Sequence, residues 1–213
     1  MMNRRDVVIF DLGNVLIDFD PRRVYREFYK GDEVALQHFF DSRAMWDILN
    51  HGHDTLDSWD VAFDDLKAKR PDLSKEIDLF CRDWFKFILG PIPSTLGIFN
   101  QLLDNKVKLY ALTNWPSQVW PPQTHPESEV LHDYSFLDKF DDIVVSGQEQ
   151  LRKPAPELYQ LALERWQVDP QRCIFVDDLP ENVEAANRLG ILGHHFTSAE
   201  KLAKELTEHG LLV

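Results

Sequence analysis

The chain has 213 residues, of which 36 are acidic and 23 basic, and its formal net charge at pH 7 is −13. A field of this sign repels nucleic acids and anionic lipid surfaces, so we expect no nucleic-acid and no membrane partner. An anionic substrate would need local positive charge or a metal ion. The length allows one substantial core, or a main domain with a smaller domain inserted in it.

The cysteine content and the start of the chain bear on its location. Cys81 and Cys173 are the two cysteines, and each lies in an apolar stretch, as is typical of a protein in a reducing compartment. The apolar run before Asp11 is too short for a signal peptide or a membrane span. We therefore expect a soluble, cytoplasmic protein, and leave open whether it is a monomer or a homodimer.

Four apolar, strand-like segments each end in polar residues. The first is Val7–Phe10, a short run that predicts a buried strand and is followed by Asp11. The other three run into polar pairs: 107–112 into Thr113-Asn114, 143–145 into Ser146-Gly147, and 173–176 into Asp177-Asp178. In an open α/β sheet, ligands bind outside the carboxyl ends of the strands. The sequence therefore predicts one site built from these strand ends.

The expected helices divide the chain into two parts. From residue 106 onward, strands alternate with helices over 156–168, over 180–189 and from Thr197 to near Gly210, which predicts a parallel sheet with right-handed crossovers. Residues 21–89 contain no convincing buried strand but have amphipathic stretches at 22–28, 33–40, 58–69 and 75–87. We expect an α/β core formed by residues 1–17 and 92–213, with a small all-helical domain, residues 18–91, inserted after the first strand. A proline-rich loop is expected at 115–126.

The acidic residues suggest phosphoryl chemistry. A carboxylate such as Asp11 can attack a phosphoryl group and form an aspartyl-phosphate, although an aspartate at such a junction often only bonds to the backbone of its own turn. Asp177 and Asp178 would repel Asp11 in a low-dielectric site unless a cation were bound. Oxygen ligands of this kind suit Mg²⁺. The alternative is that the acidic pair is solvated and caps the helix at Pro180.

Two further segments provide donors and a counter-charge. Thr113 and Asn114 offer groups that can donate to phosphate oxygens, although such residues are also ordinary at a turn. Lys153 precedes a helix in a loop stiffened by prolines, and a fixed ammonium there could neutralise both Asp11 and a phosphate. A lone lysine at such a position is usually solvated, so it gains weight only with the other elements.

In order and spacing, these segments resemble the four motifs of the haloacid dehalogenase superfamily of hydrolases. The matching stretches are Phe10-Asp11-Leu12-Gly13-Asn14-Val15, Leu112-Thr113-Asn114, Lys153-Pro154 and Phe175-Val176-Asp177-Asp178, with Asn182-Val183-Glu184-Ala185-Ala186 continuing the last. The resemblance implies a three-layer, Rossmann-like core with a parallel sheet. It also implies that the helical insert is a cap that closes over the site and selects the substrate.

The resemblance also implies a role for each residue. Asp11 would be the nucleophile, with Lys153 and Thr113 as further catalytic residues. Mg²⁺ would be held by Asp11, the Gly13 carbonyl and Asp178, with Asp177 as a second or outer ligand. Phosphate would be bound by Thr113, Asn114, Lys153 and Asn182, and Asn182 would also support the fourth motif.

Gly13 departs from the usual pattern of the superfamily. Most of its phosphatases carry a second aspartate there as general acid and base, and losing such a group costs roughly 10²–10⁴-fold in rate unless it is replaced. A similar subgroup, sugar-phosphate phosphatases that begin Asp-Leu-Gly-Asn-Val, has the same glycine. We expect a cap residue, a water or the substrate to supply the proton. His51, His53 and Asp54 are candidates, although surface histidines are more often idle.

Three other activities compete with the phosphatase prediction. A 2-haloacid dehalogenase would use the same aspartate without metal, but the dehalogenases resembling this chain lack the acid pair 177–178. A phosphomutase usually needs the acid and base missing at Gly13. A non-catalytic phospho-acceptor module would also unite aspartates, a threonine and a lysine at strand ends, but receiver domains are much shorter and lack a helical insert of this size. A regulatory protein that had lost its activity is suggested by Gly13 alone, whereas Asp11, Lys153 and the acid pair all remain. The sequence therefore predicts a Mg²⁺-dependent phosphatase of small phosphorylated metabolites, with sugar phosphates as candidates.

Overall fold

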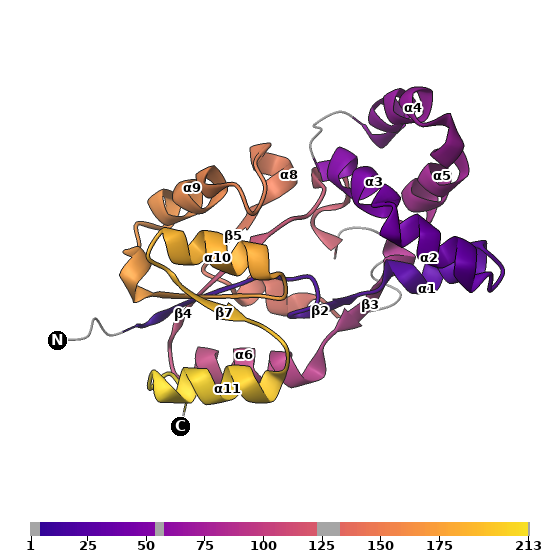
Figure 1. The fold of residues 1–213 in the computed structure, drawn as a ribbon. Helices are drawn as coiled ribbons and strands as arrows, with labels where there is room; N and C mark the ends of the chain where they lie inside the picture. The colour runs from indigo at the N-terminus through magenta and orange to yellow at the C-terminus, as the bar shows by residue number, and fades with distance from the viewer. Residues whose placement is uncertain (1–4, 54–57, 123–132, 213) are drawn as a thin grey trace.

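The computed structural model describes residues 5–53, 58–122 and 133–212, and of His53 only the backbone. Its centre is a five-stranded sheet in the order β5-β4-β1-β6-β7, in which every neighbouring pair is parallel (Figure 1). The strands are β1 Val7–Phe10, β4 Lys108–Thr113, β5 Asp142–Val145, β6 Cys173–Asp177 and β7 Leu192–His195. This sheet confirms the predicted α/β fold.

Helices cover both faces of the sheet and make the core three-layered. Successive strand residues point to opposite faces, so Val7 and Ile9 pack with α9 and α10, while Val8 and Phe10 pack with α6 and α11. Figure 1 shows α6 and α11 below the sheet and α9 and α10 above it. The core helices are α6 Pro93–Asp104, α8 Ser146–Glu149, α9 Pro156–Trp166, α10 Pro180–Arg188 and α11 Ala199–Glu208, with 3₁₀ turns at Ser117–Val119, Ser135–Lys139 and Pro170–Arg172.

A second group of helices lies beyond the carboxyl end of β1 (Figure 1). It is enclosed between two short strands, β2 Ile17–Phe19 and β3 Ile88–Pro91, which pair antiparallel. Its helices are α1 Pro21–Phe28, α2 Glu33–Asp41, α3 Ala44–His53, α4 Trp59–Lys69 and α5 Ser74–Asp83, with 3₁₀ turns at Pro71–Leu73 and Trp84–Phe87. Its interior is aromatic, with Tyr25, Phe63, Phe80 and Phe87 each 1% exposed or less.

The structure contains elements that the sequence analysis did not predict. The β2–β3 ribbon, α3, α6 and β7 each carry a weak local signal: the ribbon strands have 3 and 4 residues, and β7 reads Leu-Gly-His-His. Pro93 marks a chain return in the sequence, but here it occupies the first turn of α6, where its missing N–H costs nothing. No helix within the described ranges is both long and apolar enough to cross a bilayer.

Candidate active site

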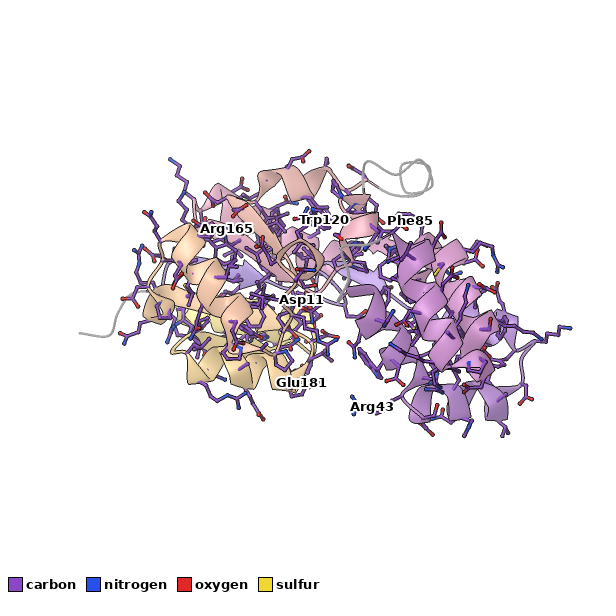
Figure 2. All side chains as sticks on the ribbon, turned by 90° about the horizontal axis from the view of Figure 1, so that it is seen from above. Asp11, Arg43, Phe85, Trp120, Arg165 and Glu181 are labelled. Carbon is purple, nitrogen blue, oxygen red and sulfur yellow. The ribbon has the colours of Figure 1, made fainter. Side chains whose placement is uncertain are left out.

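Asp11 lies at the carboxyl end of the central strand β1, where the core meets the helical insert (Figure 2). Its backbone N–H donates to the carbonyl of Val176 at 2.8 Å, which continues the pairing of β1 with β6. Its Oδ1 accepts from the N–H of Leu12 at 2.7 Å and lies 2.9 Å from the Nζ of Lys153. The carboxylate is buried and fixed in one direction, as a nucleophile requires.

Lys153 joins two buried carboxylates through one ammonium group. Its Nζ lies 2.9 Å from Asp11 Oδ1 and 2.7 Å from Asp177 Oδ2, and 5.4 Å from the centre of the Phe175 ring. Burial lowers the pKa of this lysine, but the attraction of Asp11 and Asp177 outweighs it and the net shift is upward. The side chain is therefore a permanent cation in a site from which water is largely excluded.

Asp177 is held by donors on both of its oxygens. Oδ1 accepts from the Leu179 N–H at 2.9 Å and from Asn182 Nδ2 at 2.9 Å, and Oδ2 accepts from Lys153 and from Asn182 at 3.1 Å. The Tyr159 hydroxyl donates to the Asn182 carbonyl at 3.0 Å. The geometry thus directs the Asn182 amide to Asp177 and Asp177 to Lys153, and the predicted role of Asn182 as a phosphate ligand stays a prediction.

Asp178 faces Asp11 from the end of β6. Its Oδ2 accepts from Asn14 Nδ2 at 3.3 Å, and its carbonyl lies 3.1 Å from a ring nitrogen of His195 at the end of β7. Burial and then the charge of Asp177 raise the pKa of Asp178. Neither Asn14 nor His195 was predicted as a site residue, because their contacts depend on the pairing of strands distant in sequence.

The three carboxylates form a group that can hold a metal ion. Asp11, Asp177 and Asp178 each offer an oxygen, and these oxygens lie within 4.8 Å of one another. Burial, opposed by Lys153 and reinforced by Asp177 and Asp178, raises the pKa of Asp11 to about 7. Three carboxylates around one ammonium leave an excess of negative charge, which an oxygen-binding divalent cation such as Mg²⁺ would balance.

Gly13 lies beside this group with free space around it. The bridge between Gly13 and Ile17 is made by the Leu12 carbonyl and the Asn14 N–H, so it leaves the Gly13 carbonyl free of that pairing. A Cβ built on Gly13 would meet no atom within 4 Å. The backbone here therefore suits the predicted metal contact, and close packing does not explain why the residue is a glycine.

The end of β4 fixes the backbone of Lys153. Asn114 Oδ1 accepts from the Lys153 N–H at 2.9 Å, and Asn114 Nδ2 donates to the Lys153 carbonyl at 3.0 Å. Thr113 is buried one residue earlier, paired with Val145 of β5. The structure thus brings Asp11, Thr113, Asn114, Lys153 and the acid pair to one edge of the sheet.

A cavity of about 700 Å³, counted to its open mouth, lies above these residues. Its polar floor is Asp11, Gly13, Asn14, Asn114, Lys153, Asp178 and Asn182, and its largely apolar wall is Phe19, Trp46, Leu49, Asn50, Trp84, Trp115 and Leu179. A second cavity, about 1080 Å³ to its mouth, adjoins it and is lined also by Arg43, Arg152 and Glu181. Figure 2 shows Arg43 and Glu181 on opposite sides of the gap between insert and core.

The predicted proton donors of the insert are only partly described. The Nε2 of His51 lies 2.7 Å from the carbonyl of Ala62, and the ring packs beside Phe63. His51 therefore bonds within the insert and is absent from the residues lining the cavity. The side chain of His53 and all of Asp54 lie outside the described residues.

Comparison with known proteins agrees with this geometry. Residues 5–190 match the family of haloacid dehalogenase-like hydrolases. The chain belongs to this family of enzymes. The four motif segments of this hydrolase are the segments that meet at the cavity floor, and its family membership confirms the resemblance drawn from them.

Several curated relatives of this hydrolase are named as phosphatases or hydrolases. Flavin mononucleotide hydrolase 1 of Arabidopsis thaliana is 44% identical over 93% of the chain and 66% of its own length. A sesquiterpene phosphatase of Aspergillus oryzae is 32% identical over 56% of the chain and 58% of its own length. The chain thus spans less than two thirds of either relative. D-ribitol-5-phosphate phosphatase of Bacteroides thetaiotaomicron is 24% identical over 86% of the chain and 87% of its own length.

Solved structures show the same fold at lower sequence identity. A haloacid dehalogenase family enzyme of Bacteroides thetaiotaomicron superposes with a TM-score of 0.69 at 23% identity, over 95% of this chain and 98% of that one. L-2-haloacid dehalogenase of Xanthobacter autotrophicus gives 0.61 at 21% identity, over 95% of this chain and 82% of that one. A dehalogenase is among the structures that share this fold, so the fold alone does not choose between phosphatase and dehalogenase activity.

Proposed function

We propose that this hydrolase is a Mg²⁺-dependent phosphatase of small phosphorylated metabolites, working through an aspartyl-phosphate on Asp11. The observation that carries the proposal is the pairing of Asp11 with Lys153 beside a third and fourth charged group, Asp177 and Asp178. A dehalogenase would use the nucleophile without a metal, whereas an acid cluster with excess negative charge suits a bound cation. The names of the relatives also favour phosphate esters as substrates.

The metal site would consist of Asp11, the Gly13 carbonyl and Asp178. Asp177 is bonded on both oxygens by Lys153, Asn182 and the Leu179 N–H, so we assign it a supporting position behind the ligands. Mg²⁺ would supply charge neutralisation between Asp11 and the phosphate. One structural neighbour of the same fold is described as a complex with magnesium and inorganic phosphate, which supports this assignment.

The chain's own residues account for the covalent steps. An Asp11 oxygen attacks phosphorus as the bond to the leaving alkoxide breaks, and the ammonium of Lys153 offsets the charge that gathers. The alkoxide takes a proton from water, which leaves hydroxide, because Gly13 has no side chain to give one. A second water then attacks phosphorus and gives its proton to that hydroxide, which frees phosphate, restores Asp11 and regenerates the first water. The sum is one ester and one water converted to one alcohol and one phosphate.

We further propose that the helical insert, residues 18–91, acts as a cap on the core formed by residues 1–17 and 92–213. The relatives supply candidate substrates: flavin mononucleotide from the Arabidopsis protein and D-ribitol 5-phosphate from the Bacteroides protein. We expect a cytoplasmic protein, in keeping with Cys81 and Cys173, which are both free thiols.

Phosphate release from a panel of phosphate esters tests the proposal. We expect turnover with Mg²⁺, loss of turnover with EDTA and recovery when Mg²⁺ is restored. Asp11→Asn should abolish turnover, and the exposed Asp104→Asn at the end of α6 should leave it unchanged. Metal-independent release of halide from a 2-haloacid, or the absence of turnover on every ester in the panel, would overturn the proposal.

A further inference from the structure

Trp46 differs from the other tryptophans of the cavity wall in being exposed. Its side chain belongs to the insert helix α3 and is 42% exposed. Trp84 and Trp115 of the same wall are buried, with ring centres 5.9 Å apart. Among the described residues no aromatic ring packs against Trp46. Exposing a large indole in a cavity forgoes the free energy of burying it, which a ligand that covers the ring would recover.

The position of Trp46 relates it to the reacting centre. Trp46, Leu49 and Asn50 lie at i, i+3 and i+4 on α3, so they share one face of that helix. All three line the cavity whose floor contains Asp11, and Trp46 also lines the adjoining cavity. Trp46 therefore stands where the two cavities meet, beyond the position of a phosphate held at Asp11.

Leu179 completes this junction from the core side. It follows the acid pair and, like Trp46, lines both cavities. Asn50, on the same face of α3 as Trp46, also lines both cavities. A flat, uncharged ring that extends outward from a phosphate at Asp11 would cover apolar surface of Trp46 and Leu179 at this junction. A polyol would leave Trp46 exposed, and the side chains of Trp46 and Leu179 would give its hydroxyls no hydrogen-bond partner.

Resting on the proposed phosphatase activity, we propose that the substrates are phosphate esters carrying a flat aromatic ring system, and that Trp46 is the residue that stacks on this ring. The inference separates the two candidate substrates. Flavin mononucleotide and D-ribitol 5-phosphate carry the same phosphorylated ribitol chain, and only the flavin adds a ring system. Trp46 should therefore favour the flavin.

Steady-state kinetics with this pair of substrates tests the assignment. Wild type should hydrolyse flavin mononucleotide with a higher kcat/KM than D-ribitol 5-phosphate. Trp46→Ala should lower kcat/KM for the flavin about tenfold or more, mainly through KM, since aromatic stacking contributes on this scale. It should leave D-ribitol 5-phosphate nearly unchanged, and Trp46→Phe should keep most of the preference. Val34→Ala, at an exposed apolar residue of α2 outside the cavity lining, is the matched control.

A binding measurement separates failure of this inference from failure of the proposed function. Riboflavin carries the ring without the phosphate, and calorimetry should show that it binds wild type and Trp46→Phe, but Trp46→Ala far more weakly. Equal kcat/KM for both substrates, or an equal loss for both in Trp46→Ala, would overturn the role of Trp46 while the phosphatase stands. Riboflavin binding that depends on Trp46, without turnover of any phosphate ester, would overturn the phosphatase proposal and keep the ring site.

Discussion

Lys153 neutralises only part of the charge around it. It contacts Asp11 and Asp177, while Asp178 lies close by without contact to the ammonium in the described structure. Burial is the main cause that raises the pKa of Asp11 to about 7; Lys153 opposes this rise, and the charges of Asp177 and Asp178 add to it. A bound cation would keep Asp11 ionised and nucleophilic at neutral pH.

Replacing Asp11 should therefore change how stability depends on pH. Between pH 4 and pH 7 the unfolded state ionises Asp11 while the fold holds it protonated, so the fold loses stability as the pH rises towards the raised pKa of about 7. Asn cannot ionise and escapes this loss. In EDTA, the unfolding free energy of Asp11→Asn minus that of wild type should increase from pH 4 to pH 7 by on the order of 2–4 kcal/mol. Urea titrations at each pH measure this difference in unfolding free energy. Saturating Mg²⁺ should make the difference rise less with pH. A difference that does not depend on pH would contradict the argument.

Gly13 allows a direct test of the missing proton carrier. Because a Cβ there would meet no atom within 4 Å, Gly13→Asp should fold normally. A carboxyl at this position can protonate the leaving oxygen, a contribution of roughly 10²–10⁴-fold in favourable cases. We expect kcat for alkyl phosphates, whose leaving groups are basic, to rise at least severalfold, and kcat for p-nitrophenyl phosphate to change little. An equal change in kcat for both substrates would show that protonation of the leaving oxygen does not limit kcat in the wild type.

At the scale of elements, the start of α8 packs against the loop that follows β4. The Gly147 N–H donates to the Trp115 carbonyl at 3.1 Å, and the Trp115 N–H donates to Ser146 Oγ at 3.0 Å. A Cβ on Gly147 would lie 2.4 Å from the Ser117 nitrogen and 2.8 Å from the Trp115 oxygen, both backbone atoms that cannot yield easily. This contact ties β5 to the loop carrying Asn114 and Trp115.

Gly147→Ala should separate these segments. We expect a loss of about 1–3 kcal/mol in unfolding free energy, as overpacking against backbone typically costs, and a lower kcat because Asn114 holds Lys153. Gly97→Ala is the matched control: Gly97 lies exposed within α6 with no atom near its Cβ. That change should raise stability by about 0.5–1 kcal/mol. Chemical denaturation of both variants checks the pair, and equal effects would refute the close-approach argument.

At the scale of the whole molecule, the site lies between two bodies that share one apolar core. Trp84 of the insert contacts Phe19 on the ribbon and Trp115 on the core, with ring centres 5.7 and 5.9 Å away. The proposed metal ligands directly follow β1 and β6, which pair with each other in the middle of the sheet. Metal binding and global stability should therefore be coupled.

Mg²⁺ at about a hundred times its dissociation constant should stabilise the fold by about 2.7 kcal/mol, a rise in Tm of roughly 5–10 °C for a chain of this size. Asp178→Asn should lose most of this rise, because it removes a ligand. Glu181→Gln, an exposed change three residues along the chain, should retain it. Thermal unfolding with and without Mg²⁺ measures the rise in Tm for each variant. An identical rise for Asp178→Asn and Glu181→Gln would exclude Asp178 from the metal site.

The strands with strong local patterns were predicted nearly to the residue. Predicted Val7–Phe10 matches β1, and the predicted strand at 173–176 lies within β6 Cys173–Asp177. The helix predicted over 58–69 became α4 Trp59–Lys69. The missed helix α3 carries Trp46, Leu49 and Asn50, so the sequence pattern did not predict this part of the cavity wall. Its sequence, Ala-Met-Trp-Asp-Ile-Leu-Asn-His-Gly-His, acquires its buried and exposed faces from the neighbouring helices.

The sequence by itself determined four of the five parallel strands, the polar residues at their ends and the family, because an apolar strand followed by a polar residue is a local pattern that survives in any parallel sheet. Only the tertiary structure decided the hydrogen-bond partners and the exposure of those residues. It gave both oxygens of Asp177 to Lys153, Asn182 and a backbone N–H, left Asp178 facing Asp11, and exposed Trp46 at the cavity junction. The pairing of Asp11 with Lys153 and its approach to Asp178 join segments more than a hundred residues apart, and no local pattern encodes such contacts.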